Sequence, residues 1–308
     1  MYNAPPGRLK RALRAVSASS PASVASPVLG TSQTSPASLV SPTSPAGEDV
    51  DIIRYYKEQY LSFLMTKSPE WSFVSGIVYL GRTNSAVMSL IMANVQFQAA
   101  HTLQPHPSAP RRLQALQHYQ SGLQDFSALV ASGEYEPLTL LSALFLLVQF
   151  ELRHADNVDG IQSHLRAFGA VLTLVPGLCG ETNLEYRNVL NRLGLWLTYM
   201  DAVAAAWDLG GGVIHTVLDS FGPHALDRVF AESREAGQEI WGASYPTAEA
   251  LDDLQNRPAF DLYHAAHILR YHVACYRFAA QGGQEDNDAL RKRIEDTICK
   301  IYQVREVY

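Results

Sequence analysis

Residues 134–177 read EYEPLTLLSALFLLVQFELRHADNVDGIQSHLRAFGAVLTLVPG, and they dictate the kind of fold to expect. As a helix, residues 137–153 are apolar on almost every side, through Leu140, Leu141, Leu144, Phe145, Leu147, Val148, Phe150 and Leu152. The only polar line along it is made of Thr139, Ser142, Gln149 and Arg153. A helix that is apolar all round is either the centre of a large bundle or a membrane span, and this run is shorter than the roughly 20 residues of a span. We therefore predict a buried central helix, called the hub helix below, in an all-α domain.

The segment after the hub helix predicts the first packing partner of that helix. Ile161, Leu165, Phe168 and Leu172 recur at spacings of 4, 3 and 4 residues, which places them on one face of a second helix. Two helices joined by a short connection form an antiparallel hairpin. We expect this face to dock on the hub helix.

From Glu48 onward the chain shows helical patterns and no strand-like alternation. The further helices are predicted over residues 51–65, 71–80 (mixed with turns), 84–103, 113–131, 184–208, 258–280 and 288–308. The last pattern shows no stop signal, so we expect the domain to continue beyond Tyr308. The predicted fold class is all-α: a large multi-helix bundle over residues 48–308, preceded by a disordered tail over residues 1–47.

Each predicted helix has an expected buried face. In chain order, the inward residues are Ile52, Tyr56, Tyr60, Phe63 and Leu64; Val87, Leu90, Ile91, Val95 and Phe97; Leu116, Tyr119, Leu123, Phe126 and Val130; Leu190, Leu193, Leu197, Met200, Ala204 and Trp207; Leu262, Ala266, Leu269, Val273 and Tyr276; and Leu290, Ile294, Ile298 and Ile301. Asn84 is predicted to cap one helix and Gly133 to end another. Pro105, Pro107 and Pro110 are predicted to form a connection that cannot continue a helix. Residues 221–245 carry no clear pattern.

The tail from residue 17 to residue 47 is a low-complexity tract of Ser, Pro, Ala and Thr. Such a composition buries too little apolar surface to offset the entropy of ordering, so we predict disorder. The tract contains five Ser-Pro pairs, which begin at Ser20, Ser26, Ser35, Ser41 and Ser44. It is either a flexible linker or a cluster of sites for proline-directed kinases.

Charge is distributed unevenly along the chain. Residues 1–47 hold Arg8, Lys10, Arg11 and Arg14 and no acidic residue. This segment has three interpretations: the basic tail of a DNA-binding region lying upstream, a nuclear import signal, or a mitochondrial transit peptide. From Glu48 onward 20 basic residues face 30 acidic ones. Because duplex binding depends on basic groups that neutralise phosphates, we expect no direct nucleic-acid binding by the body.

Cysteine usage indicates a reducing compartment. The chain has three cysteines, Cys179, Cys275 and Cys299, which are far apart and form no C-x-x-C pair. An odd number without close pairs argues against a disulfide framework. No apolar h-region follows Met1, which argues against a secretory signal, and no segment predicts a membrane span.

Histidines on the predicted helix over 258–280 are the first candidate metal site. Asp261 with His264, or His264 with His267, could reach one metal ion. His272 would lie about 80° around the helix from His264 at 3.6 residues per turn. No partner ligand of recognisable spacing occurs elsewhere, so we interpret these residues as partly buried, hydrogen-bonded histidines.

Two acidic segments resemble the magnesium motifs of all-α terpene synthases. They are Asp252-Asp253-Leu254-Gln255-Asn256, and Asn287-Asp288 with Glu295. However, Arg291 stands where that second motif requires Ser or Thr, and the segments lie about 35 residues apart, far closer than that fold allows. We interpret them as solvated helix ends.

Other chemical motifs give no catalytic assignment. Gly210-Gly211-Gly212 lacks a preceding strand and a Lys at phosphate-loop spacing, so it is interpreted as a helix terminator. No Gly-x-Ser-x-Gly occurs, and His164 is interpreted as a structural histidine. We therefore assign no catalytic, cofactor-binding or metal-binding residue, and we expect no enzyme activity and no cofactor.

Four segments resemble, in the right order, the fungal-specific transcription factor domain, the helical regulatory region of fungal zinc-binuclear-cluster transcription factors. They are HYQSGLQDF (118–126), LLSALFLLVQFEL (140–152), IQSHLRAFGAVL (161–172) and WLTYMDAVAAAW (196–207). The second has Glu151 at the family's Glu position, and the third has His164, Arg166 and Gly169 at the family's polar and small positions. The third also departs from the pattern, with Ile161 where Trp is usual and Ala167-Phe168 between Arg166 and Gly169.

The resemblance covers residues 50–308 and implies an all-α regulatory domain in the nucleus. Its partners would be proteins of the transcription machinery or a small effector, and homodimerisation stays open. The family's six-cysteine zinc cluster does not occur in this chain, so no zinc ligand is assigned. Either a DNA-binding module has been lost upstream or the chain is a natural regulator without one.

Two alternative hypotheses remain at this point. The Arg- and Ser-rich, acid-free N-terminus is also typical of an organellar protein, which would make the body a mitochondrial helical interaction protein. The acidic segments suggest a metal-dependent all-α enzyme as the third hypothesis.

Overall fold

The computed structural model describes residues 54, 69–102, 109–133, 136–154, 158–174, 186–209, 212–214, 222, 225–280 and 287–307. These residues are mainly helical and include no strand, so the predicted all-α fold is confirmed. The predicted tail over 1–47 and most of the predicted helix over 51–65 lie outside the described residues. Among the described residues, no helix has both the length and the apolar character that crossing a bilayer requires.

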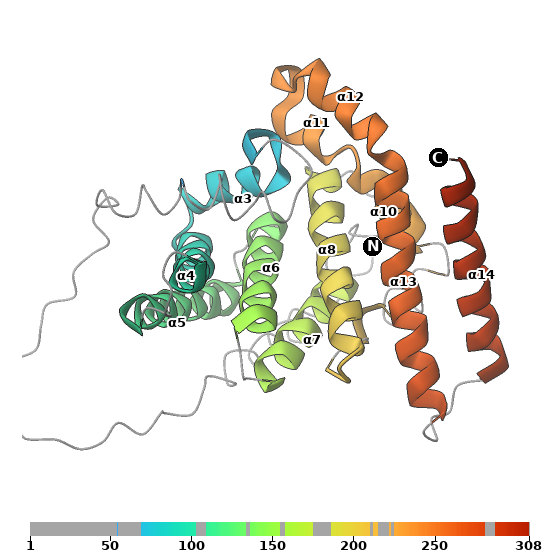
Figure 1. Ribbon diagram of the computed structural model, residues 1–308. Coiled ribbons are helices and arrows are strands. Elements are labelled where there is room, and N and C mark those ends of the chain that lie inside the picture. The colour runs from blue at the N-terminus through green and yellow to red at the C-terminus, as the bar shows by residue number, and fades with distance from the viewer. Residues whose placement is uncertain are drawn as a thin grey trace, which may run out of the picture.

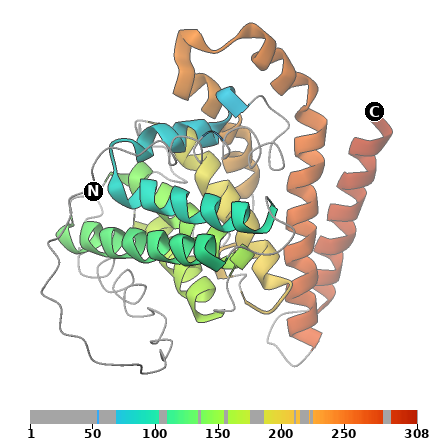
Figure 2. The same ribbon diagram turned by 60° about the vertical axis from the view of Figure 1, so that its left-hand side comes forward.

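The described helices follow one another in a long series. In chain order they are α3 (Phe73–Gly81), α4 (Ser85–Thr102), α5 (Ala109–Ser132), α6 (Pro137–His154), α7 (Val158–Leu174), α8 (Arg187–Ala205), α10 (Ala225–Ser233), α11 (Ala236–Trp241), α12 (Thr247–Gln255), α13 (Arg257–Ala280) and α14 (Asn287–Val307), with short 3-10 turns at Pro69–Trp71 and Gly242–Ser244. Helices α4 and α5 lie side by side at one side of the bundle, α6 and α8 are central, and α13 and α14 form the opposite side (Figures 1 and 2). The segment without a clear pattern therefore contains α10 and α11.

Helix α6 is the predicted hub helix. It packs against α4, α5, α7 and α8, and Leu140, Leu144 and Leu147 are 0% exposed. Its polar line is buried as well, because Thr139, Ser142 and Gln149 lie below 9% exposure, and only Arg153 reaches solvent. The helix is thus enclosed on nearly all sides, as its composition predicted.

The predicted hairpin partner and the long helix after it are also present. All four predicted inward residues of α7 are buried, and α7 packs against α6 and α8. On α8, Leu190, Leu193 and Leu197 are buried as predicted. The prediction for Trp207 is wrong, because α8 ends at Ala205 and Trp207, just beyond it, is 73% exposed.

Local signals explain several helix ends. The side chain of Asn84 accepts a hydrogen bond from the Val87 amide at 3.1 Å, which confirms the predicted cap of α4. Gly133 has a φ of 75°, a left-handed conformation that glycine adopts without strain, directly after α5. Pro110, by contrast, lies within α5 rather than in a connection, because the first turn of a helix tolerates proline.

Helices α4 and α5 approach closely. A Cβ atom added at Gly122 would lie 2.7 Å from Cγ of Leu90, so this approach requires glycine. Four of the five predicted inward residues of α5 are buried, namely Tyr119, Leu123, Phe126 and Val130. The fifth, Leu116, is 49% exposed, so that prediction is wrong.

The predicted faces of α13 and α14 are largely wrong. On α13, Val273 and Tyr276 are exposed, whereas His264, His267 and His272 are buried. On α14, Leu290 is buried as predicted, but Ile298 is 37% exposed, and Ile294 and Ile301 are only partly buried. The reason is packing: α13 turns its histidines towards α8, α10 and α14, and α13 is the main neighbour of α14.

Candidate functional site

A first buried polar cluster joins α5, α6 and α7, and we call Tyr119, Glu151 and His164 the sealed cluster. The Tyr119 hydroxyl donates a hydrogen bond to Oε1 of Glu151 and lies 3.2 Å from Nε2 of His164. The same His164 nitrogen lies 3.8 Å from the Glu151 carboxylate. Each residue comes from a different motif of the resemblance, so the three motif helices meet at one point.

Burial dominates the chemistry of the sealed cluster. Burial first, and then the Glu151 carboxylate, raise the pKa of Tyr119, so its hydroxyl stays protonated and acts as a donor. The Phe150 ring stacks on Tyr119 at 4.5 Å, and Phe97 meets Phe150 edge-on at 5.7 Å. This arrangement fixes three helices relative to one another rather than presenting groups to a substrate.

A second polar cluster lies between α8, α10 and α13, and we call Tyr199, His264 and Asp227 the open cluster. The Tyr199 hydroxyl lies 2.8 Å from Nδ1 of His264, and Nε2 of His264 lies 3.3 Å from Oδ1 of Asp227. The Phe230 ring stacks on the imidazole at 4.4 Å. Asp227 is 55% exposed, so one end of this chain of contacts reaches solvent.

The three predicted histidines of α13 face two other helices, with His264 and His267 against Tyr199 of α8 and His272 near Thr297 of α14. His264 belongs to the open cluster, His267 stacks on Tyr199 at 4.4 Å, and His272 lies 3.5 Å from Oγ1 of Thr297. Burial first, then neighbouring cations, lower the pKa of both His267 and His272 to about 4. Both imidazoles are therefore neutral at pH 7.

A cavity of about 180 Å³ lies beside the open cluster, between α6, α8 and α13, and we call it the aromatic cavity. Its walls include Phe145, Trp196, Tyr199, Tyr263 and His267, together with the amide of Gln149. Gln149 and His267 are 3% and 7% exposed. Neither Oε1 of Gln149 nor Nδ1 of His267 has a hydrogen-bond partner among the described residues. Both atoms are almost wholly inaccessible to water, so neither opens into the cavity.

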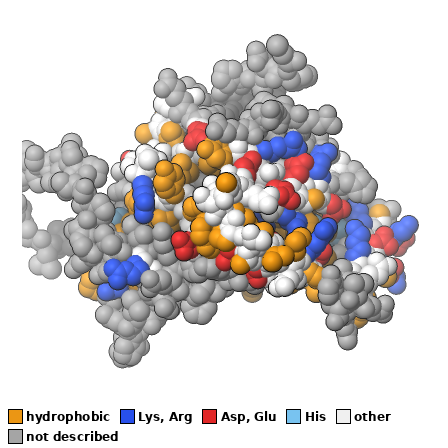
Figure 3. Space-filling model, turned by 90° about the horizontal axis from the view of Figure 1, so that it is seen from above, with side chains coloured by type: hydrophobic (Ala, Val, Ile, Leu, Met, Phe, Trp, Pro, Cys, Tyr) orange, Lys and Arg blue, Asp and Glu red, His pale blue; other side chains and the backbone are white. Residues whose placement is uncertain are grey.

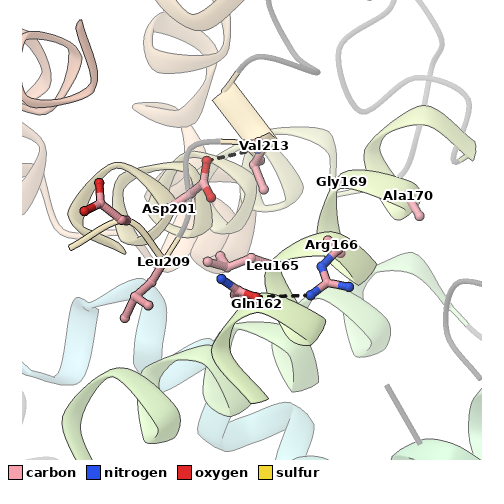
Figure 4. Close-up of a pocket in the computed structure, with 10 residues that line it drawn as sticks. Gln162, Leu165, Arg166, Gly169, Ala170, Asp201, Leu209 and Val213 are labelled. Carbon is pink, nitrogen blue, oxygen red and sulfur yellow. Dashed lines mark hydrogen bonds between the residues drawn. The ribbon is translucent and has the colours of Figure 1, made fainter. Parts of the chain in front are cut away.

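A larger cavity of about 610 Å³ lies between α7 and α8 (Figure 4). Its polar side chains are engaged with the protein itself. Oδ2 of Asp201 accepts hydrogen bonds from the amides of Val213 and Ile214 at 3.0 and 3.2 Å, and Arg166 donates to Gln162 at 3.3 Å. The cavity includes Arg166 and Asp201 from two of the motif segments, yet its polar contacts stabilise the local backbone.

The acidic segments of the sequence do not form one site. The Tyr245 hydroxyl donates to Asp253 at 2.6 Å, and the Asn256 amide donates to Asp252 at 2.8 Å. Glu295 is paired instead with Arg291 on α14 at 3.1 Å. No group of three or more His, Cys, Asp or Glu side chains that could hold a metal ion occurs within the described part of the chain.

The remaining sequence candidates are scattered. Cys275 and Cys299 are thiols on α13 and α14, while Cys179 lies outside the described residues, as do Gly210 and Gly211. Sequence reasoning noted Gln149 only as part of the polar line of the hub helix. That polar line was the available signal, because a glutamine on an otherwise apolar helix needs a partner from elsewhere.

The chain was compared with protein-family models, with curated proteins and with solved structures, and none of the three comparisons gave a match. The function proposed for the chain therefore depends on its own residues and their contacts.

Proposed function

We propose that this chain is the helical regulatory domain of a transcription regulator of the fungal zinc-cluster type, acting in the nucleus by binding a partner or a small effector rather than by catalysis. The observation that supports it is the sealed cluster. Tyr119, Glu151 and His164 come from three motif segments that are far apart in sequence, and their side chains meet in one buried contact. Motif positions that converge in this way belong to one structural unit.

The charge of the body favours a protein or small-molecule partner over nucleic acid. Acidic residues outnumber basic ones from Glu48 onward. On the face shown in Figure 3, acidic and basic side chains are interspersed, and hydrophobic side chains gather near the middle. Duplex recognition depends on basic groups gathered along one surface, so the proposed regulator acts on DNA through other proteins.

The test is a tethered reporter assay. The full chain is fused to a heterologous DNA-binding module with its own nuclear import signal, and transcription from a reporter promoter is compared with that from the module alone. The expected result is a several-fold change in either direction, lost in the Leu144→Asp fusion, in which the folded domain is disrupted. A fusion that is folded and occupies the promoter, yet leaves transcription at the level of the module alone, contradicts the proposal.

The location is tested separately. Residues 1–47, which contain the basic segment, are fused to a fluorescent protein and imaged. Accumulation in the nucleus is expected. A mitochondrial signal would instead favour the organellar interaction protein.

A further inference from the structure

Helix α8 turns an apolar face towards solvent at the aromatic cavity. Between residues 193 and 205 the only side chains that are not buried are Trp196, Met200 and Val203, at spacings of 4 and 3 residues. All three line the cavity, and Trp207 follows just beyond the helix, 73% exposed. The solvent side of a helix is normally polar, and Trp and Met are enriched where proteins bind one another. This face therefore has the composition of an interface.

Arginines border this apolar face. Arg153 of α6 lines the cavity and reaches solvent, and Arg270 is exposed on α13, two turns after Tyr263. Burial raises the pKa of Tyr263 and lowers that of His267, and the charge of Arg270 also acts on both, so Arg270 lies beside the cavity. No Asp or Glu is among the described residues that line it. Complementary charge favours a partner that is both apolar and acidic.

Helix α12 of the same chain has that character. It contains Glu249, Asp252 and Asp253 and no basic residue, and none of its residues is buried. Its exposed side carries Leu251 and Leu254, which are 54% and 63% exposed. Two leucines three residues apart lie on one face of a helix, which is the spacing of the anchors by which an amphipathic helix binds a groove.

Within one molecule α12 is held away from the cavity. The Tyr245 hydroxyl donates to the Asp253 carboxylate at 2.6 Å, and Arg234 donates to the Asp253 carbonyl at 3.2 Å. Neither leucine of α12 lines the cavity. Helix α12 lies at the top of the molecule in Figure 1, directly before α13, which contributes Tyr263 and His267 to the cavity. The two complementary surfaces are thus neighbours that a second copy can bridge.

The cavity is large enough for one leucine side chain. A cavity of roughly 150 Å³ accommodates benzene, and this one measures about 180 Å³. The side chain of leucine has fewer carbon atoms than benzene. One leucine of α12 therefore fits inside, and the other can pack on the exposed face of α8.

We propose that the chain forms a two-fold symmetric homodimer, in which α12 of each copy docks on the aromatic cavity of the other. The carboxylates of α12 then lie near the arginines that border the cavity. Two-fold dimers are the commonest closed assemblies, and in them each surface of one copy meets its complement on the other. The reciprocal arrangement makes both contacts at once and doubles the buried surface. This inference goes beyond the proposed function and does not depend on it.

The experiment is sedimentation equilibrium of the purified full chain over a dilution series. Reversible conversion between one chain and two chains is expected. Raising the salt concentration should weaken the dimer, because salt screens the attraction between exposed charges. A chain that stays monomeric at every concentration overturns the proposal. Assemblies that grow beyond two chains overturn the reciprocal arrangement.

Variants on each surface locate the contact. Leu251→Asp alters α12 and Val203→Glu alters the cavity. Each should raise the dissociation constant of the dimer about a hundredfold, because about tenfold or more is lost at each of two equivalent contacts. Arg270→Glu should also weaken the dimer, through repulsion of α12. Leu113→Asp is the matched control, at a leucine of α5 that is 58% exposed, and its dissociation constant should equal that of the wild type.

A mixture tests the reciprocity. Leu251→Asp protein keeps an intact cavity and Val203→Glu protein keeps an intact α12, so together they retain one of the two contacts and should associate more tightly than either variant alone. Each variant is first shown to unfold cooperatively in urea. A dimer unaffected by both substitutions contradicts the assignment. Sedimentation involves no transcription, so a monomeric chain with an active reporter fusion would refute only the dimer, and a dimer with an inactive fusion would refute only the proposed function.

Discussion

The sealed cluster and the open cluster use similar side chains in different surroundings. Each has a tyrosine hydroxyl within reach of a histidine nitrogen, and each includes a carboxylate. In the sealed cluster the carboxylate of Glu151 is 4% exposed, while in the open cluster Asp227 is 55% exposed. The sealed cluster lies beneath the stacked ring of Phe150, whereas Tyr199 of the open cluster forms part of the wall of a cavity.

The difference teaches that the same residue types can be enclosed in the core or can form a chain of contacts that ends at the surface. A fully buried carboxylate requires its hydrogen bonds, since an unpaired buried charge is strongly destabilising. A carboxylate that reaches water loses little when its partner changes. Breaking a contact should therefore cost more in the sealed cluster than at the exposed end of the open cluster.

The largest effect is expected from the hub helix that carries Glu151. Leu144→Asp places an unpaired carboxylate at a position that is 0% exposed, which costs several kcal/mol against a typical stability of about 5–15 kcal/mol. The variant should fail to fold, as measured by circular dichroism and size-exclusion chromatography. The matched control Leu254→Asp, at a position 63% exposed on α12, should fold normally. A cooperatively folding Leu144→Asp protein would show that the hub helix is not central.

The next largest loss of stability is expected in the sealed cluster, and the open cluster should lose less. Glu151→Ala leaves the buried Tyr119 hydroxyl without its acceptor and should lower the free energy of unfolding by about 1–3 kcal/mol. Asp227→Ala removes a half-exposed carboxylate and should lower it by less than about 1 kcal/mol. Urea unfolding at pH 7 measures both values. Equal losses would remove the distinction between the clusters.

Acid should lower the free energy of unfolding through protonation of His267. Its pKa is about 4 in the folded protein and about 6.5 when unfolded, so between these values the unfolded chain binds more protons and the free energy of unfolding rises with pH. The stability that the neutral His267 imidazole contributes is fully present above about pH 6.5. The free energy of unfolding then falls by about 1–3 kcal/mol as the pH drops towards 4. Urea unfolding at pH 7 and pH 5 measures it.

His267→Phe should reduce this pH dependence. Part of the pH dependence of the free energy of unfolding should remain in this variant, because the pKa of His272 is also lowered to about 4. An unchanged slope in His267→Phe would mean that the imidazole titrates normally and is not buried beside Tyr199.

The smallest effect is expected outside both clusters. Glu295 pairs with Arg291 on α14, and both side chains are more than half exposed. Glu295→Gln should change the free energy of unfolding by less than about 0.5 kcal/mol, since exposed pairs on a helix contribute little. A change comparable to that of Glu151→Ala would show that α14 depends on charge rather than on packing.

The comparison of expected and observed faces shows where sequence patterns were sufficient. The faces of α4, α6 and α7 were predicted correctly, because aliphatic residues at helical spacing leave only one way to bury them. On α13 the prediction followed Val273 and Tyr276, and both are exposed. The buried face carries His264 and His267 instead, because Phe230 and Tyr199 stack on their rings. A pattern of apolar residues cannot anticipate aromatic partners from other helices.

The candidate site was even less accessible from sequence. Glu151 and His164 were noticeable as polar residues at motif positions, and Tyr119 was expected to point inward. Their meeting depends on how α5 crosses the α6–α7 hairpin. The aromatic cavity has residues from four helices in its wall, so no single segment of the sequence predicts it.

The sequence by itself determined that the chain folds as helices around a buried hub, because periodicity and apolar content are local properties of a segment. The tertiary structure alone decided which polar groups are paired and which are left open. Hydrogen bonds such as those between Tyr119 and Glu151, and between Tyr199 and His264, join residues that are 32 and 65 positions apart. Contacts at that range depend on helix packing, so the sealed and open clusters emerge only when the whole bundle is assembled.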